Sequence, residues 1–330
     1  MAKIIKNTAL GICVLNEESS LVKTLNSILS QTVYPEKLVI VDGGSTDKTS
    51  DIIAGFRPKF EALKIKFIFL LCDKGLAESR NAVIKKSGAS IIVFTDAGCY
   101  ATKNWFETLI NCLLSNPDVE IASGFYKLKA DSAFSKAYAC FVAVLPKYLY
   151  EKSFLPSTRS VAIKASVFRK IGCFNPKLKV GEDTEFFYRA AVAGIKFKLC
   201  QKAQVVWFEL SKIDLFSAAK KFYSYAKADA LTGILWHPRQ RLNSHFIKIM
   251  TIYLRYLIFS VVLFYNLKLF FSVFAFYLFY SYNKFFKQKI PATVRVYFPL
   301  LQLVSDLAVM FGFLSGSLIK FFIYERRSSE

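Results

Sequence analysis

Apolar runs of strand length alternate with segments of helical periodicity through the first 125 residues. Between two such runs, Leu21, Leu25 and Ile28 recur at the spacing of one helix face. Alternation of this kind predicts right-handed crossovers and a mostly parallel sheet covered by helices on both faces. The predicted strands lie near residues 9–15, 38–41, 66–71, 90–95 and 119–125.

The pattern is less regular between residues 126 and 235, but it still mixes helices with strands. Together with the first part, this segment predicts one α/β domain over residues 1–235, built on a doubly wound, mostly parallel sheet. The elements predicted here are a helix at 131–145, a strand at 160–164, a helix opened by Glu182-Asp183, two strands near 196–208 and a helix at 213–232.

Residues 236–330 form a second predicted region, in which long apolar stretches dominate. A bilayer core about 30 Å thick needs roughly 20 helical residues, and the stretch 247–282 exceeds that length. Asn266 offers a break that makes a helical hairpin, and Gly312 and Gly316 favour close helix packing further on. A buried, all-helical soluble domain is the alternative. The predicted transmembrane segments are 247–265, 268–282 and 296–320.

One acid, Asp306, interrupts the last of these segments. An ionisable side chain in an apolar span is costly unless it is paired or hydrated, so it indicates a structural polar contact or a site near a lipid acceptor. Arg255 is the predicted partner.

The charge balance is strongly basic, with a formal net charge of +21. Basic side chains beside apolar spans favour anionic membrane lipids as partners, and they also suit a diphosphate ligand. No zinc-finger spacing or aromatic-basic RNA motif accompanies them, so nucleic acid is not an expected partner. The seven scattered cysteines and two histidines argue against a zinc site and fit a reducing compartment.

A basic loop between the last two apolar segments indicates how the chain is oriented in the membrane. The positive-inside rule keeps such a loop in the cytoplasm. The expectation is therefore a multi-pass protein of the cell membrane whose catalytic domain is cytoplasmic, with the number of full crossings left open. The basic residues of the loop are Lys284, Lys287, Lys289 and Arg295.

Three carboxylates stand where chain segments begin or end. Asp42 follows one buried strand, Asp96 ends another, and Asp183 opens an amphipathic segment. Ligands of open parallel sheets bind in the crevice beyond the carboxyl ends of the strands, so these acids are expected to point into one pocket. Acids that converge on a polar ligand indicate a cation, a proton transfer, or both.

Several motifs occur one after another along the chain. They are Cys13-Val14-Leu15-Asn16-Glu17-Glu18, Val41-Asp42-Gly43-Gly44-Ser45-Thr46-Asp47-Lys48-Thr49, Gly75-Leu76-Ala77-Glu78-Ser79-Arg80-Asn81, Thr95-Asp96-Ala97-Gly98 and Gly181-Glu182-Asp183. Over about residues 8–235 this order resembles the family 2 glycosyltransferases, inverting enzymes with the GT-A fold. The apolar tail resembles that of bacterial members anchored to the cytoplasmic face of a membrane.

The resemblance implies a donor site for a nucleotide-diphospho-sugar. Asp42 would accept the N–H groups of a uracil or guanine, and Asn16 and Glu17 would form the opposite wall of the base pocket. Arg80 would bind a phosphate or position the acids. The structural alternatives are a tight turn at Asp42, with Ser45 or Thr46 capping the next helix, and a solvated surface arginine at position 80.

Asp96 matches the first acid of the family's Asp-x-Asp motif, which implies ribose and metal binding. The implied cofactor is a divalent cation, Mg2+ or Mn2+, that bridges the diphosphate. Here the chain departs from the motif, because Gly98 stands where the second acid belongs and Cys99 follows. This departure weakens the support that the motif gives for a bound divalent cation.

Asp183 matches the acid that serves as catalytic base, taking the proton of the acceptor hydroxyl. The alternative is that Glu182, Asp183 and Glu185 only suit the dipole of the helix they open. Weaker assignments place four further residues on the acceptor or diphosphate side of the site. These residues are Glu182, Arg159, Lys220 and Lys221.

The predicted function is inverting transfer of a sugar from a nucleotide-diphosphate donor to a glycan or lipid-linked acceptor, in cell-surface polysaccharide or glycolipid synthesis. A dehydrogenase or P-loop enzyme would carry a glycine-rich motif after the first strand, where Asn16-Glu17-Glu18 stands instead. The remaining alternative is a non-catalytic GT-A-like membrane protein that binds nucleotide sugars. Donor sugar, nucleobase, acceptor and linkage depend on pocket shape and are left open.

Overall fold

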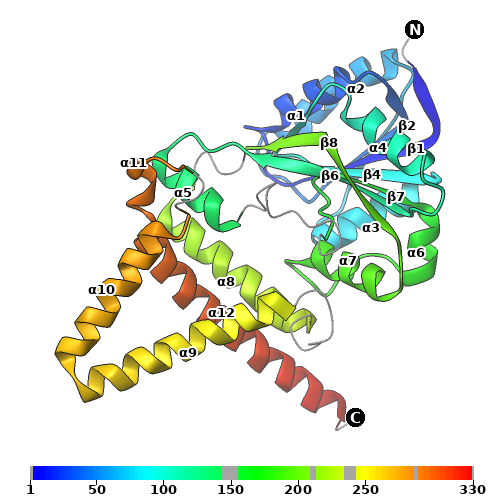
Figure 1. Ribbon diagram of the computed structural model, residues 1–330. Coiled ribbons are helices and arrows are strands. Elements are labelled where there is room, and N and C mark those ends of the chain that lie inside the picture. Colours follow the sequence, from blue (N-terminus) through cyan, green and yellow to red (C-terminus); the bar gives the residue numbers. More distant parts are fainter. Residues whose placement is uncertain (1–2, 143–154, 209–212, 234–242, 286–288, 329–330) are drawn as a thin grey trace. The chain divides into compact units, whose positions relative to one another are not determined.

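The computed structural model describes residues 3–328, with gaps at 143–154, 209–212, 234–242 and 286–288 (Figure 1). The chain divides into two compact units. The first comprises Met1–Lys129 and Leu149–Glu209, and the second comprises Ala130–Tyr148 and Leu210–Glu330. The predicted boundary at residue 235 between a catalytic and a membrane-associated region stays a prediction.

The first unit is built on a mixed sheet, in which the described residues form eight strands in the order β3-β2-β1-β4-β7-β6-β8-β5. β1 pairs in parallel with β2 and β4, whereas β7 runs antiparallel to β4 and β6. The strands are β1 (Ile4–Val14), β2 (Tyr34–Asp42), β3 (Lys66–Leu71), β4 (Ile91–Asp96), β5 (Cys99–Ala101), β6 (Ile121–Leu128), β7 (Val161–Lys164) and β8 (Phe197–Trp207).

Helices cover both faces of this sheet, as the alternating pattern predicted (Figure 1). Val39, Phe94 and Phe186 lie in the core on the face of α3, α6 and α7. Leu21 and Leu25 of α1 are fully buried on the other face, which α1, α2 and α4 cover. The helices are α1 (Leu21–Leu29), α2 (Thr49–Ala62), α3 (Leu76–Ser87), α4 (Trp105–Leu114), α6 (Ala165–Ile171) and α7 (Glu182–Val192).

Two details of the sheet differ from the sequence prediction. The segment near 196–208 was predicted as two strands, but it forms the single strand β8. β5, only three residues long, was not predicted. Such a strand is too short for a period of two to stand out in the sequence.

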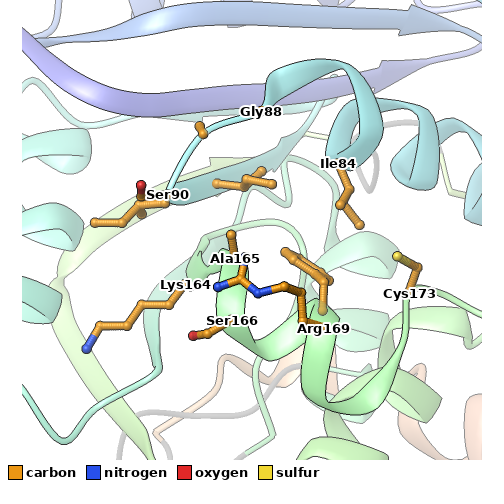
Figure 2. A pocket seen from close by; sticks show the side chains of 12 residues that line it. Ile84, Gly88, Ser90, Lys164, Ala165, Ser166, Arg169 and Cys173 are labelled. Atoms are coloured by element: carbon orange, nitrogen blue, oxygen red, sulfur yellow. The ribbon is translucent and has the colours of Figure 1, made fainter.

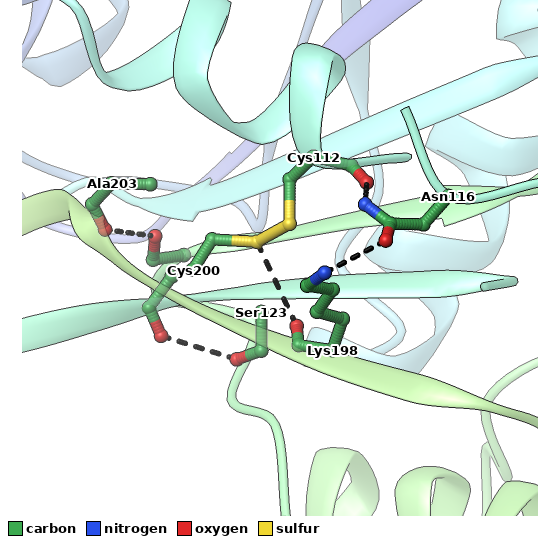
Figure 3. The surroundings of a disulfide bond; sticks show 8 residues. Cys112, Asn116, Ser123, Lys198, Cys200 and Ala203 are labelled. Atoms are coloured by element: carbon green, nitrogen blue, oxygen red, sulfur yellow. Dashed lines mark hydrogen bonds between the residues drawn. A yellow bond between two sulfur atoms is a disulfide. The ribbon is translucent and has the colours of Figure 1, made fainter. Parts of the chain in front are cut away.

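A disulfide joins Cys112 of α4 to Cys200 of β8, with their Cα atoms 6.6 Å apart (Figure 3). Spacing could not indicate this pair, because 88 positions separate the two cysteines and the packing of α4 on β8 brings them together. This disulfide was not predicted from the sequence. Cys13, Cys72, Cys99, Cys140 and Cys173 are free.

The second unit is helical over its described residues. Asn266 separates α9 from α10, and its side chain accepts a hydrogen bond from the backbone N–H of Leu269 at 3.0 Å. The predicted break is therefore confirmed, with an asparagine N-cap as its cause. The helices are α5 (Ala133–Val142), α8 (Leu215–Thr232), α9 (Asn243–Tyr265), α10 (Leu267–Asn283), α11 (Ala292–Arg295) and α12 (Phe298–Ser328).

Two stretches of the second unit are long and apolar enough to cross a membrane, Phe246–Tyr265 and Ala292–Phe322. α10 has 17 residues, which at about 1.5 Å each fall short of a 30 Å core. Large apolar side chains on these helices are exposed: Phe264 is 90% exposed and Phe311 is 63% exposed. Contiguous exposed apolar side chains of this size are typical of surfaces that contact a membrane or another protein.

The acid inside the last apolar segment is paired, as predicted. The Asp306 side chain is 1% exposed and lies 3.2 Å from the Arg255 guanidinium. Tyr277 donates its hydroxyl to Asp306, and Gln302 donates its amide at 2.8 Å. This polar network links α9, α10 and α12, and Lys284 extends it by donating to Gln302 at 2.8 Å.

Gly312 and Gly316 of α12 lie against α8 and allow a close approach of the two helices. A Cβ atom at Gly312 would overlap the carbonyl oxygen of Tyr223, and one at Gly316 would overlap that of Lys227. The prediction that these glycines serve helix packing is confirmed. The helix that these two glycines contact is α8, which is not one of the candidate membrane spans.

The Gly312→Val variant should therefore force α12 away from α8. We expect a loss of about 1–3 kcal/mol in the free energy of unfolding, the usual cost of overpacking. Unfolding in detergent, followed by helical circular dichroism, measures it. Gly55→Ala is the matched control, because a Cβ at Gly55 of α2 meets nothing within 4 Å. Equal stability of Gly312→Val and the wild type would contradict the packing role.

Candidate active site

Two of the predicted acids flank the carboxyl end of β1. In the parallel ladders, Val14 is opposite Asp42 of β2, and Cys13 is opposite Asp96 of β4. The strand-end acids therefore lie at one edge of the sheet, as their sequence positions predicted. This edge is where ligands of open α/β sheets bind.

Asp42 is occupied by its own turn. Its Oδ1 atom accepts from the backbone N–H of Gly44 at 3.1 Å and from that of Ser45 at 2.9 Å. The hydroxyl of Ser45 donates to the same oxygen, and the hydroxyl of Ser50 donates to Oδ2 at 2.6 Å. The side chain is fully buried, so a nucleobase reaches it only if the turn moves. Base binding by Asp42 stays a prediction, whereas its role in the turn is observed.

These bonds make the stability of the turn depend on pH. Burial alone would raise the pKa of the Asp42 carboxyl, but hydrogen bonds from Ser45 and Ser50 outweigh it and lower the pKa. A group whose pKa is lower in the folded state stabilises that state above its unfolded pKa of about 3.9. This contribution is lost as the pH falls through the folded pKa.

We expect Asp42→Asn to cost about 1.5–3 kcal/mol at pH 7, the range for hydrogen bonds to a charged group. The difference from the wild type should shrink at pH 3, because the wild-type carboxyl is then being protonated. Unfolding free energies at the two pH values measure this. Asp118→Asn, at a surface ion pair with Lys196, is the control. An undiminished difference at pH 3 would contradict the account.

The loop that carries Asn16 and Glu17 is bonded to this same turn. The Asn16 side chain accepts from the N–H of Thr46 at 2.8 Å, and the Glu17 N–H donates to the hydroxyl of Thr49 at 2.8 Å. The two segments predicted to form the base pocket thus form one hydrogen-bonded wall. Asp47 accepts from the N–H of Thr49, the first residue of α2, at 3.0 Å.

Arg80 lies at the centre of the acid cluster. Its side chain is 3% exposed. One end of the guanidinium is paired with Glu182, and the other lies 3.3 Å from Asp96. Burial lowers the pKa of Arg80, but the two carboxylates outweigh this effect and raise it. Arg80 is therefore a buried, charged residue that positions two acids, and the surface alternative is wrong.

Glu182 shares the burial of Arg80, with 4% of its surface exposed. Burial raises the pKa of its carboxyl, against the opposing effect of Arg80. Its contacts are structural, because they connect the start of α7 to α3 beneath the sheet edge. The predicted acceptor-side role of Glu182 stays a prediction.

Arg159 reaches the same carboxylate as Arg80. Its Nε atom lies 3.7 Å from Asp96, and its Nη1 atom donates to the hydroxyl of Ser157 at 3.2 Å. The guanidinium carbon lies 3.9 Å from the ring centre of Trp207 and 5.2 Å from that of Tyr126. Trp207 and Tyr126 were not predicted as site residues, because aromatic residues in strands read as core.

Asp183 lies at the first turn of α7 and is partly exposed. Its Oδ2 atom lies 3.4 Å from the hydroxyl of Ser157 and 3.5 Å from that of Thr158. Its Oδ1 accepts from the N–H of Thr184 at 2.8 Å. Among the described residues Asp183 forms no salt bridge, and the residue as a whole is partly exposed. This placement is suitable for accepting a proton from a bound hydroxyl.

The donor set at Asp96 fits a divalent cation poorly. Gly98 supplies no side-chain oxygen, its carbonyl oxygen accepts from the N–H of Phe208, and two guanidiniums already lie near the Asp96 carboxylate. Burial raises the pKa of the Cys99 thiol well above its usual value, and a thiol is in any case a soft ligand that Mg2+ and Mn2+ do not favour. No group of three potential metal-binding side chains exists among the described residues.

Lys220 and Lys221 belong to α8, in the second compact unit. Their predicted contact with the diphosphate stays a prediction.

Two cavities lie away from the acid cluster. One, of about 750 Å3, lies at the amino end of β4, where Ser90, Lys164 and Arg169 surround it (Figure 2). The other, of about 710 Å3, lies beside the disulfide and is lined by Asn111 and Lys198. The first is at the sheet edge opposite to Asp42 and Asp96. Neither cavity is lined by Asp42, Arg80, Asp96 or Asp183.

The curled α/β sheet with acids at this edge belongs to the GT-A fold class of nucleotide-sugar transferases. A mannosyltransferase from Pyrobaculum calidifontis, solved with GDP-Man and Mn2+, superposes with a TM-score of 0.65 at 14% identity, covering 91% of this chain and 87% of its own. GalNAc-T7, solved with UDP, GalNAc and Mn2+, gives a TM-score of 0.51 at 16% identity, over 68% of this chain and 47% of its own. These likenesses confirm the predicted fold.

Residues 10–172 match the model of the family described as glycosyl transferase family 2. Over this part, which is just under half of its length, the chain is similar to the family 2 glycosyltransferases. It is 28% identical to the glycosyltransferase AglE of Haloferax volcanii, over 56% of this chain and 60% of AglE. It is 29% identical to a poly-beta-1,6-N-acetyl-D-glucosamine synthase of Staphylococcus epidermidis, over 36% of this chain and 28% of that protein. The chain thus spans less than two thirds of these relatives.

Proposed function

We propose that this glycosyltransferase moves a sugar, with inversion, from a nucleotide-diphosphate donor to a glycan or lipid-linked acceptor. The observation that supports this proposal most is the cluster at one sheet edge, in which Arg80 connects Asp96 with Glu182 and Asp183 follows directly. The complexes with GDP-Man and with UDP in the two solved relatives support the same donor class.

In the proposed reaction, the acceptor hydroxyl oxygen attacks the anomeric carbon of the donor sugar. The bond from that carbon to the β-phosphate oxygen breaks, and its electron pair leaves with the nucleoside diphosphate. Asp183 takes the hydroxyl proton as the new bond forms. Arg80 holds Asp96 toward the donor, and Ser157 and Thr158 lie where they can orient the attacking hydroxyl beside Asp183.

We infer that the reaction takes place at the cytoplasmic face of a membrane. The exposed apolar side chains of α9 and α12, among them Phe264 and Phe311, are suited to contact with lipid. Basic residues such as Lys284 and Arg295 favour a cytoplasmic loop. The likeness to a polysaccharide synthase supports a role in cell-surface polysaccharide or glycolipid synthesis.

Membranes that contain the full chain, incubated with labelled UDP- and GDP-sugars and lipid or glycan acceptors, test this function. We expect label to appear in an acceptor, and NMR of the product should show an anomeric configuration opposite to that of the donor. Retention of configuration would contradict the inverting mechanism. Failure to bind any nucleotide sugar would contradict the proposed function itself.

A further inference from the structure

Asp96 is contacted by two arginines, although the metal-binding motif has lost its second acid. Arg80 lies 3.3 Å from one carboxylate oxygen, and Arg159 lies 3.7 Å from the other. The Arg80 side chain is buried, whereas that of Arg159 is 19% exposed. Only Arg159 of this pair therefore offers a guanidinium to a ligand at the sheet edge.

Arg159 is held in a fixed position rather than on a flexible tether. Its guanidinium stacks on Trp207 of β8 at 3.9 Å and bonds Ser157 at 3.2 Å. Its carbonyl oxygen also accepts from the hydroxyl of Thr95 at 2.9 Å, next to Asp96. Stacking and bonding of this kind keep a planar guanidinium oriented, so little entropy is lost when it binds an anion.

The structure also indicates what stands in place of the missing acid. A Cβ atom at Gly98 would lie 3.6 Å from two atoms of the Trp207 ring, which is ordinary contact. A side chain at position 98 would thus extend toward the platform on which Arg159 is stacked. The place of a second carboxylate therefore borders the aromatic ring on which the Arg159 guanidinium is stacked.

We propose that Arg159 is the fixed cation that faces the donor diphosphate, and that sugar transfer by this chain does not require a divalent metal. The inference depends on the proposed donor site. As the bond between the anomeric carbon and the β-phosphate oxygen breaks, the electron pair moves to that oxygen. The Arg159 guanidinium donates hydrogen bonds to the oxygens that gain this charge, and two parallel bonds match its fork.

Titration of the purified full chain with UDP- and GDP-sugars, in EDTA and in Mn2+, tests the inference. For the wild type we expect dissociation constants in the two conditions to agree within about threefold. Arg159→Gln should weaken binding in EDTA by about 10- to 100-fold, which corresponds to the loss of a charged hydrogen-bonding pair. Arg159→Lys should recover part of this loss, because it keeps the charge but not the fork.

The double variant Gly98→Asp, Arg159→Gln provides a second readout, because it restores the acid and removes the cation. Its donor binding should become dependent on Mn2+. Arg169→Gln is the matched control, because Arg169 lies in the same unit but lines the cavity at the amino end of β4. The Arg169→Gln variant should bind the donor like the wild type. If the wild type binds the donor in Mn2+ but not in EDTA, the inference about Arg159 is wrong, while the proposed function stands. No binding in either condition overturns the proposed function as well.

Discussion

The Asp183→Asn variant should lose sugar transfer by about 10²- to 10⁴-fold in kcat, the range of a general base. Donor affinity should change by less than about threefold, because asparagine keeps the shape of the side chain and removes only its basicity. Asp183 is suited to this role because it is partly exposed beside the hydroxyls of Ser157 and Thr158. Single-turnover transfer with membranes and a labelled donor measures the effect.

Glu185→Gln is the matched control for this experiment. Glu185 lies two positions further along α7 and is paired with Arg189 at 2.6 Å, outside the acid cluster. It should transfer sugar at nearly the wild-type rate. Unchanged turnover of Asp183→Asn would remove Asp183 as the base, and an equal loss in both variants would indicate damage to α7.

The Arg80→Met variant should have the largest effect on stability. Removing one member of a buried ion pair leaves uncompensated charge, and the usual cost is about 3–5 kcal/mol. Glu182 would lose its buried counter-charge, whereas Asp96 retains contact with solvent because 31% of its side chain is exposed. Thermal unfolding in detergent, followed by tryptophan fluorescence, measures the loss.

Two further variants distinguish the effect of lost charge on stability from the effect of lost packing in Arg80→Met. Arg57→Met removes the arginine of a surface pair with Glu61, and it should cost at most about 1 kcal/mol. The double variant Arg80→Met, Glu182→Leu removes the whole buried pair, so it should recover most of the stability. It should remain inactive, because Asp96 loses the guanidinium that aligns it. A stable and fully active Arg80→Met variant would contradict the role of Arg80.

The spacing of apolar residues predicted much of the fold, because burial of one face or of both faces of an element imposes that spacing. Strands β1, β2 and β4 are central in the sheet, so their apolar runs are nearly continuous and easily detected. The break at Asn266 could be predicted because it combines a polar residue with a change of apolar register. Arg255 could be predicted as the partner of Asp306, because a buried acid in an apolar helix needs a cation.

The remaining features depend on contacts that are distant in the sequence. The pairing of Cys112 with Cys200 follows from helix-on-strand packing. The platform of Tyr126 and Trp207 under Arg159 comes from two strands that a sequence pattern cannot align. The full engagement of Asp42 within its turn depends on Ser50, eight positions away on α2. Strand-end position alone could not separate turn formation from ligand binding.

A structure of the full chain with an unreactive nucleotide-sugar analogue tests the central claim most directly. We predict that the diphosphate lies against Asp96 and Arg159, with the anomeric carbon on the side of Asp183. An analogue bound in the cavity beside Arg169, at the opposite sheet edge, would contradict the assignment of the active site.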